Sequence, residues 1–306
     1  MSGEHMLFRP PGEADSLIIR VAEGCPWNRC AFCGMYKSVP YKFPGLRKIE
    51  AEILRLCQGH GGKADRFMFR AWVREETRPE ARRIFLADGD VMHLDFQELE
   101  QILLILNAQF KNLVRVSMYA NGASILAKTD DQLRQLKALK LHTLYMGLES
   151  GDNQALKEVD KRETAEDMIR AGQHAQAAGL RMSVMVLIGL AGKEHSLKHA
   201  RATAAALNRM QPRLLSALRL IVTPNTKLAT SGFQMLTEYE AVVETREMIA
   251  GLELEQTVFR ADHSSNIVPL EARFPKDKER LLGQLDALMA SGRLDRKSPG
   301  ALPFWL

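Results

Sequence analysis

The chain has 306 residues, 46% of them hydrophobic and 26% charged, and a formal net charge of +5. This composition is typical of a soluble globular protein with one large domain or two ordinary ones. No apolar run reaches the roughly 18 residues of a membrane span, and residues 1–5 lack a signal-peptide core. No basic run is long enough for a nucleic-acid arm. We therefore expect a cytoplasmic protein with neither a membrane nor a nucleic-acid partner.

Apolar segments and helix-like segments alternate along the chain. Short runs rich in Ile, Val, Leu, Met, Phe or Tyr predict strands at 16–22, 84–88, 113–119, 143–148, 181–188 and 217–222. Helical periodicity predicts helices at 47–58, 95–107, 129–140, 164–178, 195–209 and 237–251. Thr164 with Asp167 resembles a capping box, and Gly179 stands where a C′ glycine belongs. Residues 59–80 are irregular, and beyond residue 252 we expect an extended segment, a loop and a helix near 275–290.

Six strand–helix units in order predict an α/β fold with a parallel sheet and right-handed crossovers. Because six units are fewer than the eight of a closed barrel, we favour a partial, open (β/α)6 barrel over a flat doubly wound sheet. Periodicity alone does not separate the two. We place the core at 1–230 and a short C-terminal extension at 231–306. In either fold, ligands gather at the C-terminal ends of the strands.

Three cysteines directly follow the first predicted strand, at Cys25, Cys30 and Cys33. Clustered cysteines in a reducing compartment indicate a metal site and not a disulfide framework. Three thiolates on one loop can hold three irons of a [4Fe–4S] cluster and leave the fourth iron open for a ligand. Zinc is an alternative, but a zinc site needs a fourth ligand, for which His60 and His263 are the candidates.

The fourth cysteine, Cys57, lies on the apolar stripe of the helix predicted at 47–58, together with Ile49 and Ile53. Buried cysteine behaves as a small hydrophobic residue, so we expect Cys57 in the core and not as a ligand. With no other cysteine available, we do not expect a second cysteine-ligated cluster.

Further motifs stand at the ends of the later strands, in chain order. Phe32 precedes the third cysteine, and the strand ends read Asp88-Gly-Asp90, Tyr119-Ala-Asn-Gly122, Tyr145-Met-Gly-Leu-Glu-Ser-Gly151 with Leu156 and Lys161, Val186-Leu-Ile-Gly-Leu-Ala-Gly192, and Thr223-Pro-Asn-Thr-Lys-Leu228. Together with the cysteines, these motifs resemble the radical S-adenosylmethionine (SAM) enzymes over roughly residues 16–230. The nearest branch resembles the oxygen-independent coproporphyrinogen oxidases and methylthiotransferases. The first cysteine gap has four residues where that superfamily usually has three.

The resemblance implies a [4Fe–4S] cluster on the three cysteines and SAM as second cofactor, in an oxygen-sensitive enzyme. It implies that the SAM amino group meets the second strand end, its ribose or methionine part the fourth, and its adenine the fifth. The residues so assigned are Asp88, Gly89, Asp90, Glu149, Ser150, Ile188 and Gly189, with Phe32 at the adenine edge. Asn121 and Arg219, at the ends of the third and sixth strands, face either SAM or the substrate. The implied reaction is reductive cleavage of SAM to a 5′-deoxyadenosyl radical that abstracts hydrogen from an unidentified substrate. A flavodoxin or ferredoxin is the implied electron donor.

Several of these assignments have simpler alternatives. Asp88 and Asp90 also suit a helix N-cap turn, and Arg219 also suits a surface ion pair. A polar cluster in the tail, formed by His263, Ser264 and Asn266, could close over the substrate mouth, and the near-neutral pKa of His263 would suit proton transfer. Tyr119 is one of two tyrosines, with Tyr36, that are candidate hydrogen donors. The rival class is a non-radical iron–sulfur protein, either an electron carrier or a cluster- or haem-binding chaperone on the same scaffold.

Overall fold

The computed structural model describes residues 7–57 and 80–301. Their contacts divide them into two compact units, which are described in turn. The first contains the chain up to Asn28, Ser38–Tyr145 and His174–Leu180, and the second contains Arg29–Lys37, Met146–Gln173 and the chain from Arg181 onward. All but residue 80 of the irregular segment predicted at 59–80 lies outside the described residues, and so does His60. No helix in the described ranges is long and apolar enough to span a membrane.

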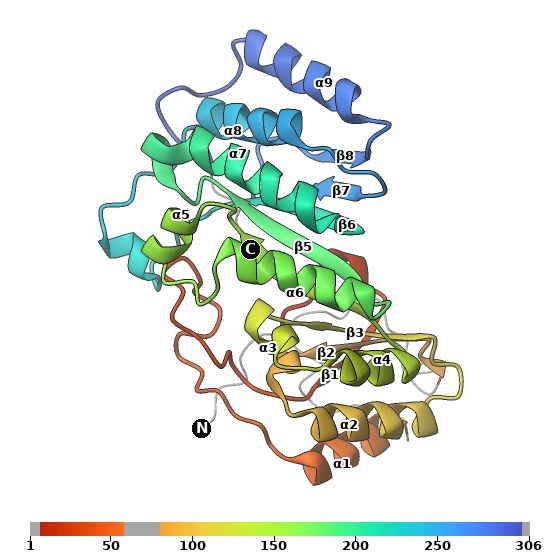
Figure 1. Cartoon of the computed structure of the whole chain (residues 1–306). Coiled ribbons are helices and arrows are strands. Elements are labelled where there is room, and N and C mark those ends of the chain that lie inside the picture. The colour runs from red at the N-terminus through yellow and green to blue at the C-terminus, as the bar shows by residue number, and fades with distance from the viewer. Residues whose placement is uncertain (1–6, 58–79, 302–306) are drawn as a thin grey trace. The chain divides into compact units, whose positions relative to one another are not determined.

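Parallel strands in chain order form the sheet of the first unit. They are β1 (Leu17–Arg20), β2 (Arg83–Ala87), β3 (Arg115–Tyr119) and the first part of β4 (Leu141–Glu149). The helical segments are η1 (Pro11–Glu13), α1 (Leu46–Cys57), η4 (Val91–His93), α2 (Phe96–Gln109), α3 (Gly122–Leu126) and α4 (Asp130–Ala138). Helix α2 packs against α1 and α4 (Figure 1). Ile84, Phe85 and Leu86 of β2 have no exposed surface, which is typical of a parallel strand covered on both faces.

The second unit contains the end of β4 and a further set of strands. These are β5 (Arg181–Ile188), β6 (Leu214–Arg219) and β7 (Val258–Ala261), which run parallel, and β8 (Leu270–Arg273), which is antiparallel to β7. Its helical segments are α5 (Asn153–Glu158), most of α6 (Ala165–Ala177), α7 (Gly192–Met210), η5 (Lys227–Thr230), α8 (Glu238–Gly251) and α9 (Lys278–Ala290). Helix α8 packs against both α7 and α9 (Figure 1).

The structure confirms the predicted α/β class with mostly parallel strands in chain order, as a partial barrel requires. The six predicted strands correspond to β1–β6. The extension adds β7, where an extended segment was expected, and β8, which was not expected. The short helices α3 and α5 have five and six residues, too few for a helical period to show in the sequence. The domain boundary at residue 230 stays a prediction.

Helix ends follow the local chemistry of the sequence. The predicted capping pair at the start of α6 is confirmed, since Thr164 and Asp167 exchange hydrogen bonds between side chain and backbone. Gly179 has φ +83°, the left-handed conformation expected of a glycine that follows a helix. Helix α8 begins with a full capping box made by Thr237 and Glu240. These caps set where α6 begins and ends and where α8 begins.

Candidate cluster and cofactor site

The clustered cysteines Cys25, Cys30 and Cys33 are of intermediate exposure and form no disulfide. Cys25 belongs to the first unit, and the other two belong to the second. Within residues 7–57 and 80–301, no three Cys, His, Asp or Glu side chains converge on a single metal ion. Each thiolate of a four-iron cluster binds its own iron, so such a ligand set does not need that convergence. Cys57 was expected in the core, but it is of intermediate exposure at the end of α1, because it stands in the last turn beside the buried Leu56. Its partial burial raises the pKa of its thiol.

The end of β2 lies directly against the first cysteine. A Cβ atom placed on Gly89 would come 2.5 Å from the Gly24 carbonyl oxygen and 2.9 Å from the Cys25 Cα. Real Cβ atoms are essentially never found that close to backbone, so only glycine fits between this strand end and the cysteine loop. Gly89 therefore lets the predicted SAM-binding turn and the first cysteine approach each other.

Two carboxylates flank this glycine, and both are buried. Asp88 Oδ2 lies 4.0 Å from Nε of Arg20, at the end of β1. Asp90 accepts hydrogen bonds from the Ser124 hydroxyl (2.6 Å) and from the backbone amide of Asn121 (3.2 Å), at the start of α3. The Asp90 carboxylate thus ties the end of β2 to the start of α3. The capping alternative is not confirmed, because Asp90 makes no side-chain capping bond to η4, the helical turn that it precedes.

In the second unit, backbone hydrogen bonds anchor the other end of the cysteine loop. The Ala31 amide donates to the Val159 carbonyl (2.7 Å), and the Ala31 carbonyl accepts from the Leu228 amide (3.2 Å). Beside them, Phe32 packs against a small hydrophobic cluster to which Leu187 of β5 also contributes. The aromatic ring predicted to meet adenine therefore packs against the same apolar cluster as Leu187 of the fifth strand.

A buried ion pair organises the end of β4. The Lys161 ammonium donates to the Gly147 carbonyl (2.8 Å) and lies 3.4 Å from Glu149 Oε1. Burial raises the pKa of Glu149 in spite of the lysine. Burial alone would lower the pKa of Lys161, but the charges of Glu149, Cys30 and Glu163 outweigh it and raise that pKa. Lys161 is therefore a fixed cation that links Glu149 to the surroundings of Cys30.

The next two residues of the Glu-Ser-Gly motif turn toward α7. The Ser150 hydroxyl, which is fully buried, lies 2.7 Å from Nδ1 of His199. The Gly151 amide donates to the Thr203 hydroxyl (3.0 Å), and a Cβ at Gly151 would collide with the carbonyl oxygen of Ala202. Helix α7 thus packs against this turn only because residue 151 is glycine. The Ser150 hydroxyl is hydrogen-bonded to His199.

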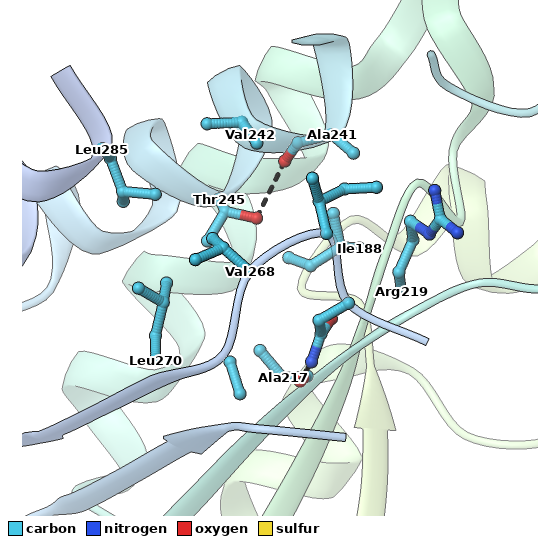
Figure 2. Close-up of a pocket in the computed structure, with 12 residues that line it drawn as sticks. Ile188, Ala217, Arg219, Ala241, Val242, Thr245, Val268, Leu270 and Leu285 are labelled. Carbon is cyan, nitrogen blue, oxygen red and sulfur yellow. Dashed lines mark hydrogen bonds between the residues drawn. The ribbon is translucent and has the colours of Figure 1, made fainter. Parts of the chain in front are cut away.

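At the end of β5, the side chain of Ile188 points into a small apolar pocket below α8. Figure 2 shows it with Ala217 of β6 and with Val242 and Thr245 of α8. Since this side chain packs against a helix, a contact of Ile188 with adenine would use its backbone. Gly189 follows with φ +88°, and its amide donates to Glu244 Oε1 (2.6 Å).

Arg219, at the end of β6, lines the edge of the same pocket and is 6% exposed (Figure 2). Its guanidinium donates to two carbonyl oxygens of the C-terminal segment, those of Ser265 (2.7 Å) and Pro299. Burial lowers the pKa of Arg219, and Glu238 opposes that effect. The structure therefore gives Arg219 a tethering contact with the tail, which neither the cofactor assignment nor the ion-pair alternative described.

The remaining candidates from the sequence have structural partners. His263 Nδ1 lies 2.9 Å from the Ser265 hydroxyl inside one turn, and burial lowers the pKa of His263. Asn266 donates to the Ala217 carbonyl (2.9 Å). In the first unit, the Tyr119 ring packs edge-on against Phe85, and burial and Asp88 raise the pKa of its phenol.

Sequence reasoning did not find two buried residues that contact the predicted strand ends, His199 on α7 and Glu244 on α8. A single histidine or glutamate within an amphipathic helix carries no signal of its own. Lys161 belongs to the motif at the fourth strand end, but the resemblance assigns it no contact with a cofactor. Its place after the Glu-Ser-Gly turn is the sequence signal for its role in the site.

An α/β fold with three clustered cysteines after its first parallel strand is the arrangement expected of an enzyme that carries an iron–sulfur cluster at the strand ends. The family model of the radical SAM superfamily matches residues 19–200. The chain belongs to the radical SAM superfamily. It is an enzyme of that superfamily whose cofactors are a [4Fe–4S] cluster and SAM, and such enzymes need a reductant and a substrate.

Solved structures of this superfamily share the fold. Methylornithine synthase (PylB) is 13% identical, with a TM-score of 0.51 over 89% of this chain and 81% of that one. Coproporphyrinogen III oxidase (HemN) from Escherichia coli is 15% identical, with a TM-score of 0.54 over 77% of this chain and 51% of that one. The methyltransferase TsrM from Kitasatospora setae is 16% identical, with a TM-score of 0.53 over 83% of this chain and 43% of that one. The chain thus spans about half the length of the last two. No curated protein sequence matches the chain.

The residues present fit the two cofactors. The close approach of Gly89 to Cys25 leaves no room for a side chain, as expected where a strand end must stay near a cluster-bearing loop. The three thiols are partly exposed, and thiolates are the usual ligands of iron–sulfur clusters. The carboxylate of Asp88 suits the ammonium group of SAM in charge.

Proposed function

We propose that this enzyme reductively cleaves SAM at a [4Fe–4S] cluster held by Cys25, Cys30 and Cys33, and that the 5′-deoxyadenosyl radical abstracts hydrogen from a substrate. The observation that carries this proposal is the packing of Gly89 against Cys25. It brings the turn proposed for SAM into contact with the first proposed cluster ligand. When bound, the reduced cluster supplies the electron that breaks the S–C5′ bond of SAM.

The chain's own residues would bind and orient SAM. Asp88 would accept hydrogen bonds from the SAM ammonium group, beside the backbone of Gly89. Glu149, held in place by Lys161, would meet the ribose or the methionine part. Phe32 would offer its apolar surface to the adenine. Asp90, Asn121, Ser150 and Ile188 would support these contacts from the structural positions described above.

The wider assignments belong to the same proposal. A low-potential donor, a flavodoxin or a ferredoxin, would reduce the cluster in the cytoplasm. Residues 231–306 would form an extension packed on a core of residues 1–230. The pairing of β7 with β6 and the two bonds from Arg219 to Ser265 and Pro299 support that packing within the second unit.

The test is anaerobic reconstitution with iron and sulfide, followed by dithionite and SAM, with 5′-deoxyadenosine measured by mass spectrometry. We expect product from the wild type and from Cys57→Ala, which is the matched cysteine control. We expect none from Cys30→Ala, because that variant lacks one of three cluster ligands. Equal product from Cys30→Ala and wild type would reject the ligand assignment.

The rival function is distinguished by the cluster's EPR signal. If a wild type with an intact reduced cluster makes no 5′-deoxyadenosine, SAM is added and the spectrum is recorded again. A shifted signal shows that SAM binds at the cluster and that cleavage awaits substrate. An unchanged signal favours an electron carrier or a cluster- or haem-binding chaperone.

A further inference from the structure

A buried polar network in the second unit joins the ends of two neighbouring elements of the proposed SAM site. Its centre is His199 on α7, which is 1% exposed, and Glu244 on α8, which has no exposed surface. His199 Nε2 lies 3.5 Å from Glu244 Oε1. Neither residue belongs to any motif that carried the family assignment. Both nevertheless reach backbone or side-chain atoms at the ends of β4 and β5.

The histidine bridges the two strand ends directly. Its Nε2 lies 3.2 Å from the Leu187 carbonyl of β5, and its Nδ1 lies 2.7 Å from the Ser150 hydroxyl after β4. A carbonyl oxygen only accepts, so Nε2 carries the proton and Nδ1 accepts the hydrogen bond from Ser150. Burial lowers the pKa of His199 to about 4, which keeps the ring neutral in this arrangement near neutral pH.

The Ser150 hydroxyl also binds the backbone of the turn that follows Glu149. While its hydroxyl donates to His199, its oxygen accepts a hydrogen bond from the Asp152 amide (2.9 Å). The residues from Glu149 to Asp152 are therefore tied through one hydroxyl to a ring that also holds β5.

The glutamate holds the turn after β5. Its Oε1 accepts from the Gly189 amide (2.6 Å), and its Oε2 accepts from the Ser196 hydroxyl on α7. Gly189 has φ +88°, a left-handed conformation that residues other than glycine rarely adopt. A charged or partly charged acceptor on that amide makes a stronger hydrogen bond than a neutral one. Glu244 thus stabilises the turn at which adenine is proposed to bind.

We propose that His199 and Glu244 are positioning residues, which hold the Glu149–Ser150 turn and the Ile188–Gly189 turn in one fixed arrangement for SAM without touching it. This inference rests on the proposed function, since those two turns are proposed SAM contacts. It implies that the affinity for SAM depends on two side chains of α7 and α8. A site whose contacts are held before the ligand arrives loses less entropy on binding.

The experiment compares Glu244→Ala, Glu244→Gln and Glu247→Ala. Glu247 is the matched control, because it lies on the same helix and also joins α8 to α7, through Arg201, but reaches no strand end. In the cluster-free chain, amide hydrogen exchange is measured at Gly189 and Asp152. On the cluster-loaded protein, the SAM dissociation constant is measured by equilibrium dialysis, with iron content determined on the same samples.

We expect Glu244→Ala to exchange faster at Gly189 and to bind SAM about tenfold more weakly, with unchanged iron content. Glu244→Gln, which keeps an oxygen acceptor, should restore most of the affinity and protection. Glu247→Ala should match the wild type. If Glu244→Ala does not fold, His199→Asn serves instead, because its amide oxygen can replace Nδ1 but nothing replaces the bond to Leu187.

The outcomes distinguish a failure of the positioning role from a failure of the proposed function. Unchanged SAM affinity in a folded Glu244→Ala, beside a wild type that binds SAM, overturns the positioning role alone. Equal losses in Glu244→Ala and Glu247→Ala also overturn it, because they indicate general loosening of α8. A wild type with an intact cluster that binds no SAM overturns the proposed function, and the positioning role falls with it.

Discussion

The Lys161 ammonium lies 3.4 Å from Glu149 Oε1, and the side chains of both residues are largely buried, with 6% and 12% exposure. Glu149 also has φ +60°, and its carboxylate folds back over Gly147 so closely that a Cβ there would collide with it. Lys161, Glu149 and Gly147 therefore pack together at the end of β4. Their packing places a charged pair beside the proposed SAM site.

Lys161→Met should destabilise the protein by about 3–5 kcal/mol, because it leaves the Glu149 carboxylate buried without its partner. Denaturant unfolding of the cluster-free chain measures this change. Lys157→Met on α5 is the control, since that lysine is exposed and its replacement should be nearly neutral. Combining Lys161→Met with Glu149→Gln should recover part of the loss by removing the stranded charge. A loss in Lys161→Met no larger than in Lys157→Met would contradict this reading.

Gly89→Ala should reduce the iron bound after reconstitution, because the new Cβ displaces the backbone at Gly24 and Cys25. Overpacking of this kind typically costs about 1–3 kcal/mol, so we expect a folded protein with a defective cluster. Gly283→Ala is the matched control: Gly283 lies in α9, and no atom is within 4 Å of the added Cβ. Iron analysis and the visible absorbance of the cluster report the result. Full iron loading in Gly89→Ala would show that the loop can shift to accept the methyl group.

Arg219→Met should release the C-terminal segment, since both Ser265 and Pro299 lose a charged donor. Each bond of this type contributes about 1.5–3 kcal/mol. Limited proteolysis and hydrogen exchange at residues 263–266 and 298–300 should detect the change. Arg213→Met is the control, because Arg213 is an exposed arginine just before the same strand and donates to the Gln256 carbonyl. A protected tail combined with lost SAM affinity would instead support the cofactor contact implied by the family resemblance.

The stability of the wild type should fall relative to Glu244→Gln as the pH rises from about 4.5 to about 7. Burial raises the pKa of Glu244 to about 7 from its ordinary 4.5, so the folded protein binds the proton more tightly than the unfolded chain. The stabilisation that proton binding gives the folded protein is complete below about pH 4.5. It is lost as the pH rises through about 7, and the free energy of unfolding changes by at most about 1.4 kcal/mol per pH unit.

His199 has the opposite dependence, because burial lowers its pKa, and it lies 3.5 Å from Glu244. The comparison is therefore repeated in a His199→Asn background, in which that dependence is absent. Free energies of unfolding measured by denaturant titration across this pH range provide the test. A constant difference between wild type and Glu244→Gln would mean that Glu244 does not titrate there.

Local patterns in the sequence were sufficient for the alternation of strands and helices, the parallel order of β1–β6 and the cysteine loop. Those features depend on short-range periodicity and on the fixed spacing of Cys25, Cys30 and Cys33, which the chain displays directly. The capping pair of Thr164 and Asp167 and the glycine after α6 could be predicted for the same reason, since each is complete within a few residues.

Only the tertiary structure decided what several of those residues contact. Ser150 meets a histidine 49 positions away, Gly189 a glutamate 55 positions away, and Arg219 a carbonyl 80 positions away. Such bonds depend on how crossover helices and the tail pack on the strands, and no local pattern records that packing. The sequence therefore determined the fold class and the cysteine spacing from which the cluster-binding loop is proposed. The supports that hold the strand ends were determined by long-range packing, because buried polar groups must find hydrogen-bond partners wherever the fold brings them.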